Sequence, residues 1–277
     1  MAASVNPRSV VLNVVRTANA QSVSIGRLIA IGELFGLTAN ALRVAVVRLV
    51  ADGLLESDER GFYGLAPKAA PLQAHVEDWR RGESRIRPWK GEWLAVSLGK
   101  AERAVRRGSL RALGRLGLRE GRAGLWLRPD NLAQSWAQTA ERLRTFGLED
   151  GAEMFRARDF GEPLERRLHA MWPTRALQQG YERALHSLQR SQSQLDSMPH
   201  DTALVESYLL GGEAIRVLAT DPLLPEAIMP GATRRELSEL MLRYDRVGRR
   251  LWSGFAARPQ LSGLTEGRNA AGGRNAN

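Results

Sequence analysis

Apolar side chains in the first seventy residues recur at helical spacing, and two short apolar runs follow them. The runs LLES and FYGL, on either side of the polar turn DERG, predict a β-hairpin. Asn6 is suited to cap a first helix that has Pro7 at its first position, and Ser24 is suited to cap a second. The pattern therefore predicts helices over residues 6–18, 24–35 and 39–52.

The third predicted helix follows a tight break at Gly36-Leu37-Thr38 and comes just before the hairpin. Three helices in this order, followed by a hairpin, are typical of a winged helix-turn-helix. The apolar side of the third helix would pack inward, which leaves a polar side for a partner. We expect the DNA contacts to come from that side, from the helix cap and from the hairpin turn, namely from Thr38, Asn40, Arg43, Val44, Val47, Arg48 and Arg60.

The residue types on this face suit base edges and phosphates. Arginine can pair bidentately with guanine, and asparagine can do so with adenine, in the major groove. The hydroxyl of Thr38 or the amides at that helix end could meet a phosphate, and Arg60 could reach the minor groove or the backbone. An ordinary three-helix packing module with surface arginines remains an alternative at this point.

The middle of the chain changes character twice. Residues 69–88 are rich in Ala, Pro and charge, which predicts a linker. Strand and helix patterns then alternate through residues 89–160, which predicts a small α+β domain that is ferredoxin-like in broad outline. The expected strands cover residues 93–98, 123–127 and 154–157, and the expected helices cover residues 101–116 and 131–146.

Helical spacing dominates residues 161–256, which predicts a C-terminal helical domain. A proline-punctuated loop, DPLLPEAIMPG, interrupts the pattern at residues 221–231. The last residues, 257–277, are polar and rich in Gly and Asn, and we expect a disordered tail there. The expected helices cover residues 164–172, 174–195, 203–219 and 233–255.

The charge is concentrated in one part of the chain. Of the formal net charge of +10, residues 1–70 carry +2, residues 71–130 carry +7 and residues 131–277 carry +1. A surplus of this kind suggests a polyanionic partner. The basic helix within residues 103–119 could touch DNA flanks, bind coenzyme A phosphates or form a solvated face.

Composition excludes several classes of site. The chain has no Cys, which excludes disulfides, thiolate metal sites and a Cys nucleophile, and its four His are scattered, so we expect no metal site. No apolar run approaches the roughly 20 residues that span a bilayer, and the N-terminus is a poor signal peptide, so we expect a cytoplasmic protein without a membrane partner. The phosphate-binding and nucleophile-elbow glycine motifs are missing too, and we expect no catalytic residues.

Three segments together resemble a known family. The first segment consists of FGLTANALRVAVVRLVADGLLES followed by GFYGLAP. The second consists of WKGEWLAVSL, RRGSLRALGRLGL and GLWLRPDNL, and the third is DPLLPEAIMPG. In this order, over residues 6–256, they resemble the PaaX-type transcriptional regulators, which are repressors of phenylacetate catabolism and their relatives. One departure is the run MPGATRREL, which has no Trp where the family often carries one.

The resemblance implies a homodimeric repressor of a catabolic operon. Its winged helix, over residues 1–68, would bind a double-stranded DNA operator, and its central domain would be Cas2-like. The helical C-terminal part would help to dimerise and to sense an effector, which in the best-known members is phenylacetyl-coenzyme A. Another acyl-coenzyme A is an alternative effector, because relatives regulate other pathways.

Three hypotheses remain beside this one. The C-terminal aromatic and basic residues could form an effector pocket or could be core and rim residues; the candidates are Trp172, Arg175, Tyr181, Tyr208 and Arg216. A Cas2-like metal-dependent nuclease would need an acidic residue at the end of the first central strand, but Lys100 follows that strand and no carboxylate precedes Glu102. The winged helix could also serve as a protein-interaction module.

Overall fold

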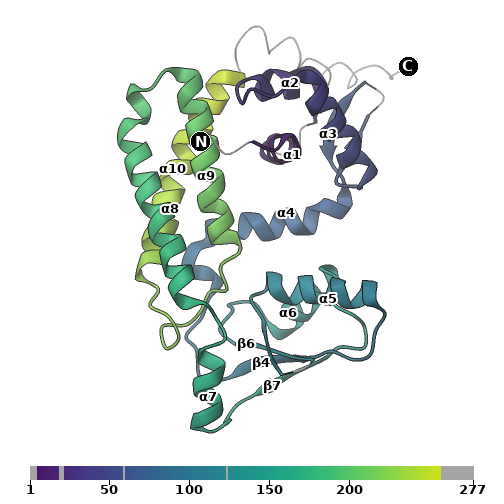
Figure 1. The fold of residues 1–277 in the computed structure, drawn as a ribbon, viewed down its shortest axis with the longest axis vertical. Coiled ribbons are helices and arrows are strands. Elements are labelled where there is room, and N and C mark those ends of the chain that lie inside the picture. The colour runs from purple at the N-terminus through teal and green to yellow at the C-terminus, as the bar shows by residue number, and fades with distance from the viewer. Residues whose placement is uncertain (1–4, 19–21, 59, 123, 257–277) are drawn as a thin grey trace, which may run out of the picture. The chain divides into compact units, whose positions relative to one another are not determined.

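The computed structural model describes residues 5–18, 22–58, 60–122 and 124–256. The fold is α+β, with many helices and two small antiparallel sheets (Figure 1). The chain divides into two compact units. The N-terminal unit comprises Met1–Gln73, Leu195–Tyr208 and Arg246–Asn277, and the central unit comprises Ala74–Gln194 and Leu209–Asp245.

The N-terminal unit begins with the predicted helices and hairpin. Their ends lie within about two residues of the predicted ones because the expected caps form: Asn6 accepts a hydrogen bond from the Arg8 amide at 2.9 Å, and Ser24 accepts one from the Arg27 amide at 3.2 Å. A short strand before the second helix was not predicted, and it completes a sheet of order β1-β3-β2. The elements are α1 (Pro7–Thr17), β1 (Val23–Ser24), α2 (Ile25–Glu33), α3 (Ala39–Ala51), β2 (Leu55–Ser57), β3 (Phe62–Leu65) and η1 (Pro67–Ala69).

The central unit contains a four-stranded antiparallel sheet of order β5-β6-β4-β7. Strand β5 was not predicted, because its sequence REGR has no apolar alternation. Helix α6 starts five residues later than expected, at a capping box made by Ser135 and Gln138. The elements are β4 (Trp93–Ser97), α5 (Arg103–Arg115), β5 (Arg119–Arg122), β6 (Leu125–Pro129), α6 (Trp136–Thr145) and β7 (Glu153–Ala157).

Side chains alternate across this sheet and bury both of its faces. On one face, Val96 packs with Leu113 of α5 and Leu143 of α6. On the other face, Trp93 and Ala95 pack with the helices that follow the sheet in the chain. The strand pattern therefore reads as nearly continuous apolar sequence, as in the run WLAVS of β4.

The C-terminal helices match the predicted ones closely. They are α7 (Glu162–His169), α8 (Thr174–Gln194), η3 (Leu195–Ser197), α9 (His200–Ala219) and α10 (Ala232–Ala256). Their residues do not form a separate unit: parts of α9 and α10 belong with the N-terminal unit and the rest with the central unit. None of the described helices is long and apolar enough to cross a membrane.

The region predicted as a linker, residues 69–88, is helical instead. It forms α4 (Ala70–Glu77) and η2 (Asp78–Arg85), and Trp79 within it is fully buried. Its charges are paired rather than free, since Arg80 bonds Asp245 and Asp78 accepts from Arg142 at 2.6 Å. The charged composition therefore predicted a linker, because the partners of these charges lie far away in the sequence. The predicted tail, residues 257–277, lies outside the described residues.

Candidate nucleic-acid interface

The position of α3 depends on its close approach to α2. A Cβ atom added at Gly32 would lie 2.3 Å from Cδ1 of Leu42, so only glycine lets the two helices meet at this distance. Gly36 adopts a φ of 69° in the turn between them, and the Leu37 amide donates to the Gly32 carbonyl at 3.0 Å. Together these contacts fix the direction in which α3 leaves the turn.

Helix α3 begins at a capped end. The Thr38 hydroxyl accepts a hydrogen bond from the Ala41 amide at 3.2 Å, while the Thr38 carbonyl accepts from the Leu42 amide. This satisfies one of the free amides of the first turn and leaves others pointing outward. The capped end is therefore compatible with an anion such as a phosphate.

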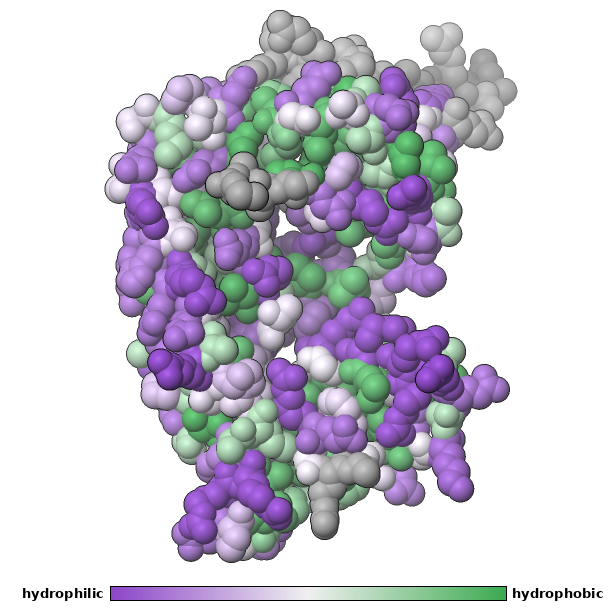
Figure 2. All heavy atoms as spheres, viewed as in Figure 1, coloured by the Kyte–Doolittle hydropathy of each residue, from purple (hydrophilic) through white to green (hydrophobic). Residues whose placement is uncertain are grey.

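The two sides of α3 differ sharply in burial. The inner side, made of Leu42, Ala45, Val46 and Leu49, is buried in the core of the N-terminal unit. The structure brings the other predicted residues of the helix together on its exposed side; they are Asn40, Arg43, Val44, Val47 and Arg48. Val47 is 67% exposed and Val44 is 42% exposed, so the exposed side of α3 carries apolar as well as polar side chains. Figure 2 shows hydrophobic residues beside hydrophilic ones over α3.

The positive charges on this side are not neutralised within the described part of the chain. Neither Arg43 nor Arg48 makes an ion pair with a described carboxylate. Asp52, at the end of α3, pairs instead with Arg8 at 2.7 Å. The exposed side of α3 thus combines free guanidinium groups, an amide and apolar contact area.

The turn between β2 and β3 is held by one side chain. Asp58 accepts hydrogen bonds from the amides of Arg60 at 3.0 Å and Phe62 at 2.9 Å, and Gly61 takes a φ of 76°. The turn presents the exposed side chain of Arg60, the one predicted contact that does not lie on or next to α3.

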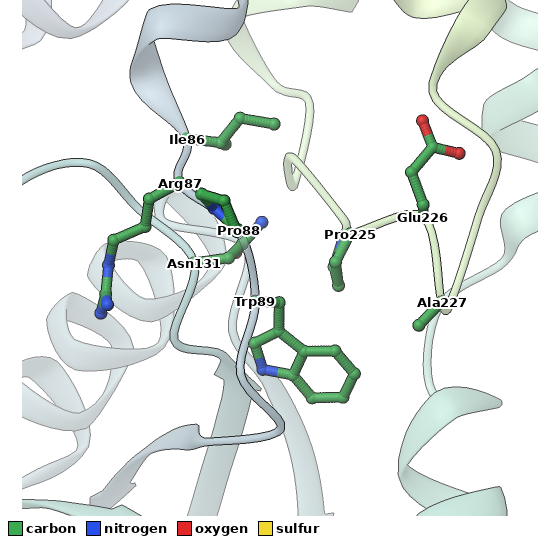
Figure 3. A pocket seen from close by; sticks show the side chains of 8 residues that line it. All are labelled: Ile86, Arg87, Pro88, Trp89, Asn131, Pro225, Glu226 and Ala227. Carbon is green, nitrogen blue, oxygen red and sulfur yellow. The ribbon is translucent and has the colours of Figure 1, made fainter.

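A cavity of about 380 Å³ lies in the central unit (Figure 3). Its walls come from the segment before β4, from the end of β6 and from the loop before α10, and are mostly apolar. The lining residues are Ile86, Arg87, Pro88, Trp89, Asn131, Pro225, Glu226 and Ala227. None of them is among the site residues predicted from the sequence, although the sequence contains the loop motif DPLLPEA and a Trp beside a Pro.

The loop behind this cavity is fastened by a buried arginine. Arg128 is 2% exposed and donates to the carbonyls of Leu116, Pro129 and Pro222, the last at 3.1 Å. It also donates to the side chain of Asn131, which in turn donates to the Leu223 carbonyl at 2.7 Å. Burial lowers the pKa of Arg128 to about 10. The loop and the cavity wall are therefore parts of one hydrogen-bonded network.

The structure does not gather the five residues predicted as an effector pocket. Trp172 and Tyr181 are buried in the core of the central unit, and burial raises the pKa of Tyr181. Tyr208 lies in the N-terminal unit, where it contacts Phe35. Arg175 and Arg216 are exposed, and none of the five lines the cavity described above. Among the described residues, no group of three or more His, Asp or Glu could hold a metal ion.

Comparisons with known proteins bear on the N-terminal unit and on the fold. Residues 6–69 match the model of the PaaX-like protein family. A search of curated proteins gave no match. Among solved structures, the chain is similar to the uncharacterized protein Rv0674 from Mycobacterium tuberculosis, with 23% identity, a TM-score of 0.52, and coverage of 88% of this chain and 99% of that chain. At 23% identity, the similarity supports a shared fold alone.

Proposed function

From the match of residues 6–69 to the PaaX-like protein family, we propose that the protein is a sequence-specific DNA-binding regulator of transcription. In the proposal it is a cytoplasmic repressor of a catabolic operon for phenylacetate or a related aromatic acid. The family suggests a regulator rather than an enzyme.

The observation that carries the proposal is the exposed side of α3. It presents Asn40, Arg43 and Arg48, which suit base edges and phosphates, next to two exposed valines, which suit thymine methyl groups. Apolar side chains and unpaired arginines on the same exposed side offer a partner both apolar and charged contacts. A helix that enters the major groove uses all of these groups.

The proposed domain is a winged helix-turn-helix. Helices α2 and α3 would form the helix-turn-helix, and the β2–β3 hairpin would be the wing that brings Arg60 to the backbone or the minor groove. Two copies, related by a two-fold axis, would bind half-sites separated by about one or more helical turns of DNA.

The test is a comparison of two duplexes. The full chain is titrated by fluorescence anisotropy against the DNA that precedes its own coding sequence and against a shuffled duplex of equal length and composition. The proposal predicts binding to the upstream duplex that is tighter by about a thousandfold or more. Equal affinity for the two duplexes would show that the chain is not a sequence-specific regulator.

We propose further that an acyl-coenzyme A, with phenylacetyl-coenzyme A as the first candidate, releases the protein from DNA. The cavity of the central unit supports this, because its size of about 380 Å³ and its apolar walls around Trp89 and Pro225 suit a small aromatic acyl group. The effector would bind the DNA-incompetent arrangement more tightly and so shift the population.

The effector proposal is tested with a panel of acyl-coenzyme A thioesters. One of them should raise the melting temperature of the full chain and weaken its binding to the upstream duplex. Ala227 is exposed at the cavity, so Ala227→Trp should fill the cavity and remove both effects without weakening DNA binding in the absence of effector. A response of Ala227→Trp equal to that of the wild type would place the effector elsewhere.

A further inference from the structure

The arginines of α5 are the strongest charged feature that the proposed function leaves without a role. Residues 103–119 contain six Arg and no Asp or Glu, and five of the six lie on α5. Outside residues 71–130 the chain is close to neutral in proportion to its length. The net charge of the protein therefore has its main source on and around this helix.

These arginines share the side of α5 that is turned away from the sheet. Figure 2 shows strongly hydrophilic side chains gathered over α5. The opposite side, with Ser109, Ala112 and Leu113, is buried against the sheet and α6. Arg103, Arg107 and Arg111 are exposed, and Arg106 and Arg115 are half-buried.

No described carboxylate lies within ion-pair distance of these five guanidinium groups. Arg106 donates to the Gly99 carbonyl at 3.1 Å, and the Arg115 guanidinium lies 5.4 Å from the centre of the Phe146 ring. Other arginines of the same unit do have acidic partners; Arg234, for example, bonds Glu83. The five arginines of α5 thus have no acidic partner among the described residues, whereas Arg234 has one.

These like charges lower the stability of α5 when no anionic partner is bound. The pairs Arg103/Arg107, Arg107/Arg111 and Arg111/Arg115 are each four residues apart, where like charges destabilise a helix by roughly 0.2–0.5 kcal/mol. Arg103 also lies in the first turn, at the positive end of the helix dipole. Burial, and then the charge of Arg111, lower the pKa of Arg115. An anionic partner along this side would relieve the repulsion.

We propose that this side of α5, which we call the α5 arginine face and define as Arg103, Arg106, Arg107, Arg111 and Arg115, binds the phosphate backbone of duplex DNA. The choice of DNA as the polyanion rests on the proposed function. Guanidinium groups can bond phosphate oxygens bidentately. From Arg103 to Arg115 the helix rises about 18 Å, which matches about five base-pair steps along a strand. Such contacts add affinity but carry no sequence information.

The test compares two double variants of the full chain. Arg107→Gln with Arg111→Gln removes two charges from the α5 arginine face. Arg190→Gln with Arg243→Gln is the matched control, because both of its arginines are exposed on other helices of the same unit. Affinity for the upstream and the shuffled duplex is measured by anisotropy between about 50 and 200 mM salt.

The α5 variant should bind both duplexes more weakly by the same factor, on the order of tenfold at about 0.1 M salt. The slope of log affinity against log salt should become shallower by about 1.8, which is the value for two lost phosphate contacts. The control variant should keep nearly the wild-type slope. Its melting temperature should be close to that of the wild type, whereas that of the α5 variant should be equal or higher because repulsion is removed.

The outcomes separate this inference from the proposed function. If the wild type prefers the upstream duplex and the α5 variant keeps wild-type affinity and slope, only the α5 contact is overturned. If the wild type shows no preference and the α5 variant weakens both duplexes, the α5 contact stands and sequence-specific regulation fails. Equal weakening of the α5 and control variants would overturn the α5 contact with DNA.

Discussion

Arg128 shows how a single buried residue can fasten a distant loop. Its guanidinium donates to the backbone carbonyls of Leu116 and Pro222 and to the side chain of Asn131. Asn131 in turn donates to the Leu223 carbonyl. A charge inside a protein is stabilising only while its hydrogen bonds are complete, and removing it leaves buried acceptors without donors. Arg128 therefore supports the cavity by holding the loop that forms part of its wall.

Replacement of Arg128 by Met should lower the free energy of unfolding by about 3 kcal/mol or more. The measurement is chemical denaturation of the full chain followed by tryptophan fluorescence. Arg119→Met, the same change at an exposed strand position, is the control and should cost no more than about 0.5 kcal/mol. Similar losses for the two variants would contradict the role given to Arg128.

His75 gives the protein a pH dependence. Burial, and then the charge of Arg142, lower the pKa of His75 to about 4, and its Nδ1 accepts from Arg142 at 2.6 Å. Between pH 6.5 and pH 4 the unfolded chain therefore binds a proton that the folded chain does not. Stability contributed by the neutral imidazole is present above pH 6.5 and lost as the pH falls toward 4.

His75→Gln should flatten the loss of stability across this window, by up to about 3 kcal/mol relative to the wild type. Thermal unfolding of both proteins at pH 7, 5 and 4 measures the difference. His200→Gln, at an exposed position on α9, should follow the wild-type curve. Parallel curves for wild type and His75→Gln would show that His75 is not shifted in this way.

At the scale of single residues, the sequence predicted the sides of α3 but missed the network around Arg128. Helical spacing separates Leu42 and Leu49 from Arg43 and Arg48 without any knowledge of the rest of the fold. Arg128 and Asn131 bond carbonyls that lie more than 90 residues away in the chain. Local patterns carry no information about such partners.

Among the elements, the contact between α2 and α3 is the one that most directly sets the geometry of the proposed DNA-binding surface. Gly32→Ala should force Leu42 to move, because the added Cβ would lie 2.3 Å from its Cδ1. Gly180→Ala, on α8, is a matched change with open space around it. Helix propensity favours alanine at both positions by about 1 kcal/mol.

The two substitutions should therefore change the stability of the protein in opposite directions. Gly32→Ala should lose about 1–3 kcal/mol of stability through overpacking and should weaken binding to the upstream duplex, whereas Gly180→Ala should gain stability. Calorimetry and anisotropy measure the two effects. A stabilised Gly32→Ala variant with unchanged DNA binding would show that the turn tolerates a wider helix separation.

Element prediction succeeded where the signals were local and failed where they were not. Caps at Asn6, Ser24 and Thr38 fixed helix starts. Residues 69–88 were predicted as a linker but form α4 and η2, since Trp79 is buried and the charges find partners elsewhere in the central unit. Strand β5 forms because β6 offers an edge, and not because of its own residues.

At the scale of the whole molecule, the charge and the candidate reading surface lie on different elements. Residues 1–70 carry a net charge of only +2, although they hold α3, while the stretch that holds α5 carries most of the surplus. In the proposed function, specificity would therefore come from α3, in a mildly basic stretch, and general affinity from the strongly basic α5. Net charge alone would have indicated α5 and would not have indicated α3.

The division into two units was not predictable from sequence boundaries. Helical spacing predicted a separate helical domain over residues 161–256, but the structure divides α9 and α10 between two units. Long helices with one continuous apolar pattern give no sign of where their packing partners change. The proposed effector response therefore rests on the cavity of the central unit rather than on a separate sensing domain.

The central claim is that α3 reads base edges, and its most direct measurement is a base-by-base specificity profile. Wild type and Arg43→Ala are each selected against a pool of upstream duplexes carrying single base-pair changes. Arg43→Ala should lose about 1–3 kcal/mol on the best site and lose the preference at one base-pair position in each half-site, with the other preferences kept. An unchanged profile, or equal weakening on every duplex, would contradict base reading by α3.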